Sequence, residues 1–132
     1  MASKSPAEFD VDGLLTDYIS PSGVTRTYTY STGKLSTVTT GMGRTLTFNY
    51  TGDRLTSVSD GNGRSVSFTV DGAGNLTAFT DAEGKDITYQ YAFPGQLTKM
   101  FLPANPTVAL VTNFYDSLGR VKAQEGANTG LY

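Results

Sequence analysis

Hydrophobic and polar positions alternate with a period of two along much of the chain. The segments Leu46–Tyr50, Val66–Val70 and Ile87–Tyr91 carry apolar residues at every second position, with Thr, Ser, Asn or Gln between them. Such alternation with β-branched and aromatic residues is typical of strands that have one apolar and one polar face. The pattern therefore predicts an all-β fold.

The predicted strands recur along the chain with a period of about 21 residues. A column of leucines follows this period, with its first two intervals one residue shorter than the next two, and Val121 continues the column. We interpret residues 9–124 as five tandem repeats, between a flexible N-terminal segment (1–8) and a C-terminal tail (125–132). The predicted repeat core consists of the column leucines and three aromatic residues: Leu15, Leu35, Leu55, Leu76, Leu97, Phe48, Phe68 and Tyr89.

The first half of each repeat leaves two alternatives open. Leu55 and Val58 are three residues apart, so a regular strand would point them to opposite faces of the sheet. A β-bulge beside the turn would bring both to one face. Otherwise, both faces of the sheet are partly covered.

Five loops share the spacing Asp-x-x-Gly, which is typical of type I turns. Asp is favoured at the first position because its carboxylate accepts backbone N–H groups, and Gly is favoured at the fourth because φ is positive there. In the shorter repeats, the loop is one residue shorter. The predicted turn residues are Asp10 and Gly13, Asp60 and Gly63, Asp71 and Gly74, Asp81 and Gly84, and Asp116 and Gly119.

We expect antiparallel turns near residues 20–23, 31–33, 41–43, 51–53, 61–63, 72–74, 82–84 and 116–119. The segment Phe101–Thr107 is different because it contains Pro103 and Pro106 in place of an Asp-x-x-Gly turn. Proline cannot donate a hydrogen bond to a neighbouring strand, so this segment is predicted to be an open loop.

Composition excludes several classes of function. The 132 residues are enough for one domain, and they include neither Cys nor His, which argues against thiol nucleophiles, His-based triads and structural zinc. The net charge is −2 and the basic residues are scattered, which argues against nucleic-acid partners. The first ten residues lack an apolar run, so we expect no signal peptide in this chain, and without a long apolar run anywhere we expect no membrane insertion.

No metal, cofactor or catalytic site is predicted. A calcium loop of the EF-hand type that starts at Asp10 would need Glu eleven residues later, where Pro21 stands. No glycine-rich phosphate motif precedes a helix, and the aspartates recur in every turn, whereas a catalytic carboxylate pair is normally unique. Arg44, Arg64 and Lys85 each follow a turn glycine, and we interpret them as solubilising charges. We interpret the aromatic columns as packing rather than as ligand platforms.

Two segments carry a family resemblance. Tyr115–Val121 (Tyr-Asp-Ser-Leu-Gly-Arg-Val, which includes Arg120) and Val70–Leu76 (Val-Asp-Gly-Ala-Gly-Asn-Leu) resemble the YD repeat of Rhs proteins, Tyr-Asp-x-x-Gly-Arg/Asn-Leu. Phe9–Leu15 is a weaker copy, and Tyr91–Leu97 lacks the Asp. Such repeats occur in bacterial Rhs and polymorphic toxins, in the C components of insecticidal toxin complexes and in teneurins.

The resemblance implies one β-hairpin per repeat, arranged in a curved or spiralling sheet, and a shell that encloses a toxin or other cargo domain. The function implied is that of a non-catalytic structural module, secreted or at the cell surface as part of a larger protein. The expected partner is a second copy, or else the remainder of the parent protein. The alternative is an adhesion module that binds glycan or protein through the aromatic columns. The self-cleaving Rhs core sequence is not evident, although the terminal Thr129–Tyr132 is similar to a stretch near such cores.

Overall fold

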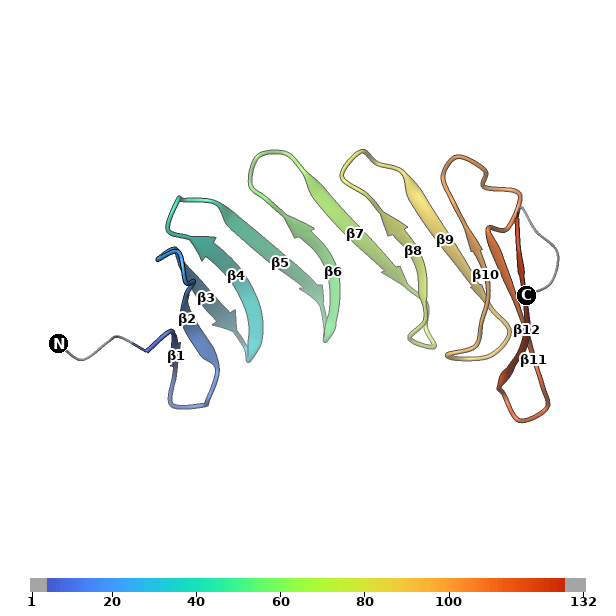
Figure 1. Cartoon of the computed structure of the whole chain (residues 1–132), viewed down its shortest axis with the longest axis horizontal. Coiled ribbons are helices and arrows are strands. Elements are labelled where there is room, and N and C mark those ends of the chain that lie inside the picture. The colour runs from blue at the N-terminus through green and yellow to red at the C-terminus, as the bar shows by residue number, and fades with distance from the viewer. Residues whose placement is uncertain (1–4, 128–132) are drawn as a thin grey trace. The chain divides into compact units, whose positions relative to one another are not determined.

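The computed structural model describes residues 5–127, and within them the chain forms twelve β-strands and no helix (Figure 1). The prediction of an all-β fold made of tandem antiparallel hairpins is therefore confirmed. None of the described residues belongs to a helix that could cross a membrane. The chain divides into two compact units, Met1–Ser65 and Val66–Tyr132, and each unit is described by itself.

In each unit every strand pairs antiparallel with the next one along the chain. The first unit contains β1 (Ala7–Phe9), β2 (Leu15–Ile19), β3 (Thr25–Ser31), β4 (Lys34–Thr40), β5 (Thr45–Thr51) and β6 (Arg54–Ser59). The second contains β7 (Ser65–Val70) from its second residue on, β8 (Leu76–Thr80), β9 (Asp86–Tyr91), β10 (Leu97–Phe101), β11 (Val111–Tyr115) and β12 (Val121–Gly126). The described strands thus form six hairpins, and the sixth is the one whose Val121 continues the leucine column.

A β-bulge follows the column residue in every hairpin. In β6, Leu55 pairs with Tyr50 and Ser57 pairs with Asn49, so Thr56 is the extra residue. The same shift occurs one residue after the column position in the other five hairpins. The bulge turns Leu55 and Val58 to the same face, and it is therefore the alternative that the structure adopts.

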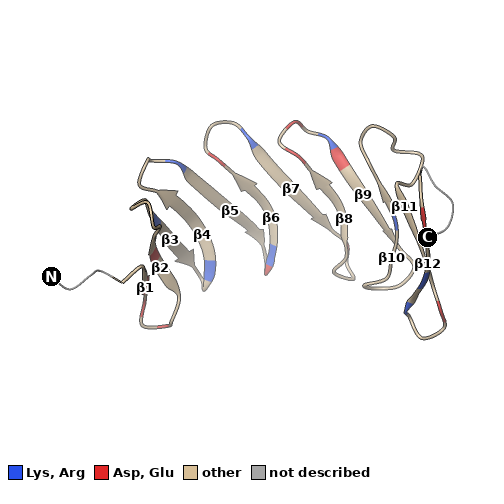
Figure 2. Ribbon diagram, in the orientation of Figure 1, with Lys and Arg blue, Asp and Glu red and all other residues tan. Residues whose placement is uncertain are grey.

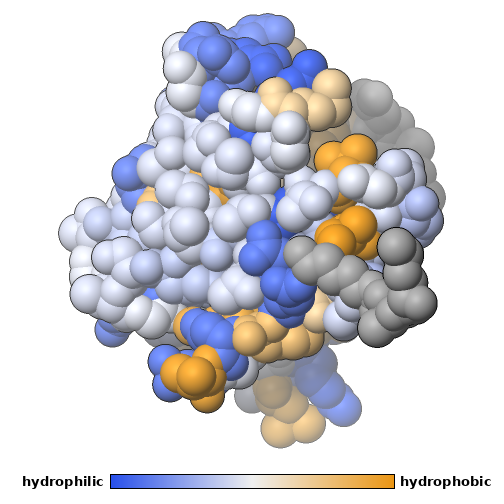
Figure 3. Space-filling model, turned by 90° about the vertical axis from the view of Figure 1, so that its left-hand side faces the viewer, coloured by the Kyte–Doolittle hydropathy of each residue, from blue (hydrophilic) through white to orange (hydrophobic). Residues whose placement is uncertain are grey.

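The two faces of each hairpin differ in chemistry. We call the face that carries the column residues and the aromatic positions opposite them the apolar face; it includes Phe68 and Phe79, whose ring centroids are 5.6 Å apart. On the opposite face hydroxyl groups meet across the strands, as in Thr29 with Thr37 (2.6 Å). None of the described side chains is fully buried, so both faces keep part of their surface exposed. Figure 3 shows mostly pale, weakly polar residues with separate hydrophobic ones on the side that it presents.

Neighbouring hairpins are paired over a short distance only. Between β2 and β3 the pairs run from Ile19–Thr25 to Asp17–Thr27 and then stop. The ladders between β4 and β5 and between β8 and β9 likewise contain three pairs. The loop that joins the two strands of one hairpin is called its hairpin turn. The loop that joins one hairpin to the next is called a connecting turn. Since the short ladders start at the connecting turns, neighbouring hairpins converge there and diverge towards their hairpin turns (Figure 1).

The turns lie where the sequence predicts them, and their glycines explain why. Glycines at the fourth position, such as Gly84 (φ 78°) and Gly119 (φ 76°), have left-handed backbone conformations. The two shorter intervals of the leucine column end in two-residue hairpin turns, of which one contains Thr32 (φ 49°) and Gly33 (φ 75°). Positive φ at both central residues defines a type I′ turn, whose twist matches that of the strands.

The segment between β10 and β11 is an open loop, as predicted. Asn105 N–H donates to the carbonyl of Leu102 over 3.0 Å, which closes a tight turn that begins at Pro103. Neither Pro103 nor Pro106 lies in a strand. Pairing resumes beyond the loop, where Val111 faces Met100.

The ends of the chain are described in part. Within the predicted flexible segment 1–8, Ala7 and Glu8 belong to β1, and residues 1–4 lie outside the described residues. Within the predicted tail 125–132, β12 extends to Gly126. Residues 128–132, with the Thr129–Tyr132 stretch, also lie outside the described residues.

Replacement of Gly84 by alanine tests the backbone requirement of the turns. A Cβ at Gly84 would meet no atom within 4 Å, so the cost comes from φ of 78° alone. We expect Gly84→Ala to lower the free energy of unfolding by about 1 kcal/mol. Gly72→Ala is the matched control, since that site also has free space but not positive φ, and Ala82 occupies the equivalent position of the next turn. Urea unfolding of both variants measures the difference, and equal losses would contradict the assignment.

Candidate functional site

The repeated feature with the most polar contacts is the aspartate at the start of each Asp-x-x-Gly turn. One carboxylate oxygen, Oδ1, accepts the backbone N–H groups of the residues two and four positions later. At Asp10 both distances are 2.9 Å, and at Asp81 they are 2.8 and 2.9 Å. The same pair of hydrogen bonds occurs at Asp60, Asp71 and Asp116. We call this pair of hydrogen bonds the turn clasp.

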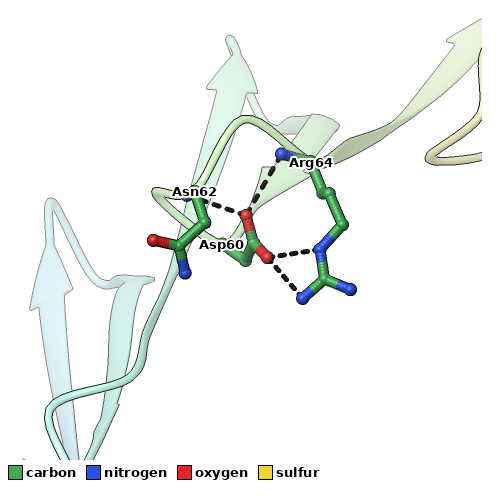
Figure 4. Close-up of polar contacts among 3 residues, drawn as sticks. All are labelled: Asp60, Asn62 and Arg64. Carbon is green, nitrogen blue, oxygen red and sulfur yellow. Dashed lines mark hydrogen bonds and ion pairs between the residues drawn. The ribbon is translucent and has the colours of Figure 1, made fainter.

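In three loops the side chain of the residue after the turn glycine binds the second carboxylate oxygen, Oδ2, of the same aspartate. Arg64 Nε donates to Oδ2 of Asp60 over 2.7 Å, and Nη2 of the same arginine lies 2.7 Å from that oxygen (Figure 4). Arg120 binds Asp116 in the same way at 2.9 and 2.8 Å. Asn75 Nδ2 donates to Oδ2 of Asp71 over 3.0 Å. In these three loops the Arg or Asn after the turn glycine thus binds the second carboxylate oxygen.

Hydrogen bonds to the charged carboxylates lower the pKa of four clasp aspartates. For Asp60 the largest cause is the backbone N–H of Asn62, followed by the Arg64 side chain. The pKa of Asp71 is lowered mainly by the Asn75 side chain. The backbone N–H of Lys85 is the main cause of the lowered pKa of Asp81, and that of Arg120 has the same role for Asp116. The carboxylates are therefore bound within their own turns.

A second repeated contact joins neighbouring hairpins where their ladder has ended. Tyr30 OH donates to the carbonyl of Leu15, in the preceding hairpin, over 2.9 Å. Tyr91 OH does the same to Leu76 (2.8 Å) and Tyr115 OH to Leu97 (2.7 Å). Each acceptor is the column residue just before a bulge. Burial is the main reason why the pKa of Tyr91 is raised.

Side chains also connect the hairpin turns of neighbouring hairpins. Lys34 Nζ donates to the carbonyl of Gly52 over 2.6 Å and lies 2.7 Å from Oδ1 of Asp53. This contact lowers the pKa of Asp53, chiefly through the hydrogen bond. In the second unit Asn75 Oδ1 accepts the N–H of Gly95 over 2.8 Å. These contacts hold the divergent ends of the hairpins together.

The predicted turn residues lie in separate loops, so the structure does not bring them together into one site. Figure 2 shows most charged residues near the turns. Among the described residues, no three acidic side chains gather where they could hold a metal ion. The predicted core residues lie on the apolar faces; Leu35 and Leu55 face Tyr30 and Tyr50, and Phe68 faces Phe79.

Sequence reasoning missed two kinds of contact. Arg64, predicted to be a solubilising charge, is 75% exposed and also pairs with Asp60. The tyrosine hydrogen bonds were missed, because the column of tyrosines five or six residues before each leucine is equally compatible with packing alone. The recurrence of Tyr in this column could have indicated these hydrogen bonds, because packing alone does not require a hydroxyl group.

Comparisons with known proteins give structural neighbours only. No protein-family model matches the chain, and no curated protein matches it. A crystal structure of TcdB2–TccC3 without its hypervariable C-terminal region is 15% identical, with a TM-score of 0.48 over 95% of this chain. The Tc holotoxin pore of Photorhabdus luminescens is 16% identical, with a TM-score of 0.44 over 91%. The chain spans 9% of the length of each of these neighbours.

The tyrosine contact leads to a prediction for Tyr91. Tyr91→Phe removes only the hydroxyl that donates to Leu76, and we expect it to lower the free energy of unfolding by about 1 kcal/mol. Tyr89→Phe is the matched control, because no hydrogen bond is made by the Tyr89 hydroxyl within the described residues. Urea unfolding measures both variants. An equal effect of the two would show that the hydrogen bond does not hold the hairpins together.

The clasp predicts how stability depends on pH. Because the folded pKa values of Asp60, Asp71, Asp81 and Asp116 lie below the ordinary 3.8, these four groups bind protons more readily in the unfolded chain than in the folded one. The stabilisation is complete above the ordinary pKa and is lost as the pH falls through the lowered values. We therefore expect a constant urea midpoint between about pH 7 and 5 and a falling midpoint below about pH 4.

Variants of Asp116 separate the effect of the turn clasp from that of the ion pair with Arg120. Asp116→Asn keeps an oxygen for the N–H groups of Leu118 and Arg120 but loses the ion pair, whereas Asp116→Ala loses both. We expect the alanine variant to be the less stable one at pH 7, and both to show a weaker acid dependence than the unchanged chain. Acid dependence that is unchanged in Asp116→Asn would contradict the role of this carboxylate.

Proposed function

We propose that the chain is a non-catalytic structural repeat module. In this proposal it forms part of a β-shell of the Rhs type, which encloses a toxin or other cargo domain. The parent protein is larger than this chain and is secreted or exposed at the cell surface. The YD-type motifs at Tyr115–Val121 and Val70–Leu76 support the family part of the proposal.

The observation that carries the proposal is the partly exposed apolar face. Each hairpin presents its column and aromatic residues on one face, yet none of the described side chains is fully buried. Leu46, for example, is 44% exposed. Apolar residues that share one face of a sheet and stay partly exposed are typical of a face that binds another part of a protein. A shell wall needs this property on its inner side.

The polar groups support a structural role rather than a catalytic one. The clasp carboxylates accept N–H groups of their own turns, and the tyrosine hydroxyls donate to carbonyls of neighbouring hairpins. A general base or a nucleophile needs a reactive group that is free to meet a substrate. The same contacts weigh against the alternative of a glycan-binding adhesion module, because the hydroxyls of Tyr30, Tyr91 and Tyr115 are already used.

Light scattering and dye binding on the full chain test this proposal. We expect the scattering mass to rise above 14.1 kDa as the concentration increases, and a dye that binds apolar surfaces, such as anilinonaphthalene sulfonate, to bind. Phe68→Ser, on the apolar face, should reduce both signals. Phe114→Ser is the matched control, since Phe114 is an exposed aromatic residue that faces Ala123 on the opposite side of its hairpin.

Two outcomes would contradict the proposal. A chain that stays at the mass of one copy at all concentrations and binds no dye would lack an adhesive apolar face. Micromolar binding on a glycan array that is lost on replacement of Tyr28 or Phe48 would favour the adhesion module instead. Circular dichroism of each variant establishes that it keeps the β-fold.

A further inference from the structure

A pocket of about 460 Å³ opens in the first unit, near the connecting turns. Its apolar part is formed by Val38 and Leu46, which pair with each other across β4 and β5. Arg26 lies two residues before Tyr28 in β3, so it shares the apolar face with Val38, the partner of Tyr28. The volume lies within the range of about 300–1,000 Å³ that is typical of ligand sites.

The pocket is strongly basic for a chain of this composition. Arg26, Arg44 and Arg64 contribute three positive charges to its lining, and Asp60 contributes a single negative one. The pocket is therefore positive by two charges, although the whole chain has a net charge of −2.

Two of the three arginines are free to bind a ligand. Asp60 holds Arg64 through Nε and Nη2. The guanidinium groups of Arg26 and Arg44 have no hydrogen-bond or ion-pair partner among the described residues. Both side chains are exposed, so a ligand can reach them without moving the sheet. A guanidinium matches a carboxylate in shape and can bind it through two parallel hydrogen bonds.

We propose that this pocket binds an acidic segment of polypeptide in which a carboxylate side chain lies next to an apolar one. The carboxylate binds Arg26 and Arg44, and the apolar side chain covers Val38 and Leu46. This inference rests on the proposed function, because the enclosed polypeptide is the partner that supplies the segment. It adds the chemistry by which the apolar face would select that partner, namely a segment in which acidic and apolar residues lie side by side.

A polypeptide fits better than a nucleic acid. Nucleic acids are bound by continuous basic stripes, whereas Lys34, Arg64 and Arg120 are paired with aspartates. The pocket also adjoins the apolar face, so one segment can occupy both. The strands that line it are paired on both sides, so the segment binds through its side chains and not as an added strand.

Titration of the ¹⁵N-labelled full chain with short peptides tests the proposal. The probe is acetyl-Phe-Glu-Leu-Glu-amide, and the matched control peptide has Gln in place of both Glu residues. We expect the acidic peptide to shift the amide signals of Val38, Arg44 and Leu46, and to bind more weakly at about 0.5 M salt than at about 0.05 M. The neutral peptide should bind at least about fivefold more weakly.

Charge variants locate the site. We expect the double variant Arg26→Gln/Arg44→Gln to weaken binding of the acidic peptide about 25-fold, which is about fivefold for each exposed charge pair. The double variant Lys99→Gln/Lys122→Gln removes the same charge from the second unit, and it should leave the affinity unchanged. Dye binding to the apolar face should stay the same in both variants, so failure of this inference is distinguishable from failure of the proposed function.

Several results would overturn the inference. The neutral peptide binding as tightly as the acidic one would remove the role of charge, and shifts outside the pocket would place the site elsewhere. Octanoate binding with Arg26-dependent shifts, while the acidic peptide causes none, would assign the pocket to a free amphipathic acid. An oligonucleotide that binds more tightly than the acidic peptide would assign the arginines to phosphate. Absence of any shift at millimolar peptide would also refute it.

Discussion

The β-bulge after each column residue is the constraint on which the rest of the structure depends. It turns both apolar positions of the second strand, such as Leu55 and Val58, to one face. Beyond it the ladder to the next hairpin is absent, so the carbonyl of the column residue is free to accept a tyrosine hydroxyl. Three such hydrogen bonds, from Tyr30, Tyr91 and Tyr115, join hairpins in this way. Thr56, Thr77 and Thr98, at three of the bulge positions, donate to the carbonyls of Asn49, Thr69 and Gln90 on the partner strand.

Within each unit the described strands must take much of their stability from contacts within the sheet. Ordinary domains bury a core between two layers, but no described side chain here is fully buried. The turn clasps, the hydroxyl pairs of the polar face and the tyrosine contacts all bind neighbouring parts of the chain. The apolar face remains partly exposed to solvent in this arrangement. The functional proposal and the proposal for the arginine pocket both depend on that exposure.

Much of the fold can be predicted from the sequence because its determinants are local. Alternation over Leu46–Tyr50 and Asp-x-x-Gly spacing at Asp71–Gly74 each specify their own strand or turn without distant contacts. The bulge could not be decided in advance, because Leu55 and Val58 fit either a bulge or two half-covered faces. The pocket could not be predicted either, since Arg26, Arg44 and Arg64 come from three successive repeats, and only the register between the strands brings them together.

Contacts between hairpins in each unit involve only adjacent hairpins, and this has a consequence for how such a chain can change in length. After deletion of one whole repeat, we expect a three-pair ladder to form between the new neighbours, and a tyrosine contact to form where the following hairpin carries Tyr, as at Tyr91, rather than Val, as at Val70. The 20-residue and 21-residue repeats differ in the hairpin turn, which lies outside that ladder. Gene duplication or loss of a repeat is therefore expected to lengthen or shorten the sheet in steps of one hairpin, without the repacking of a core.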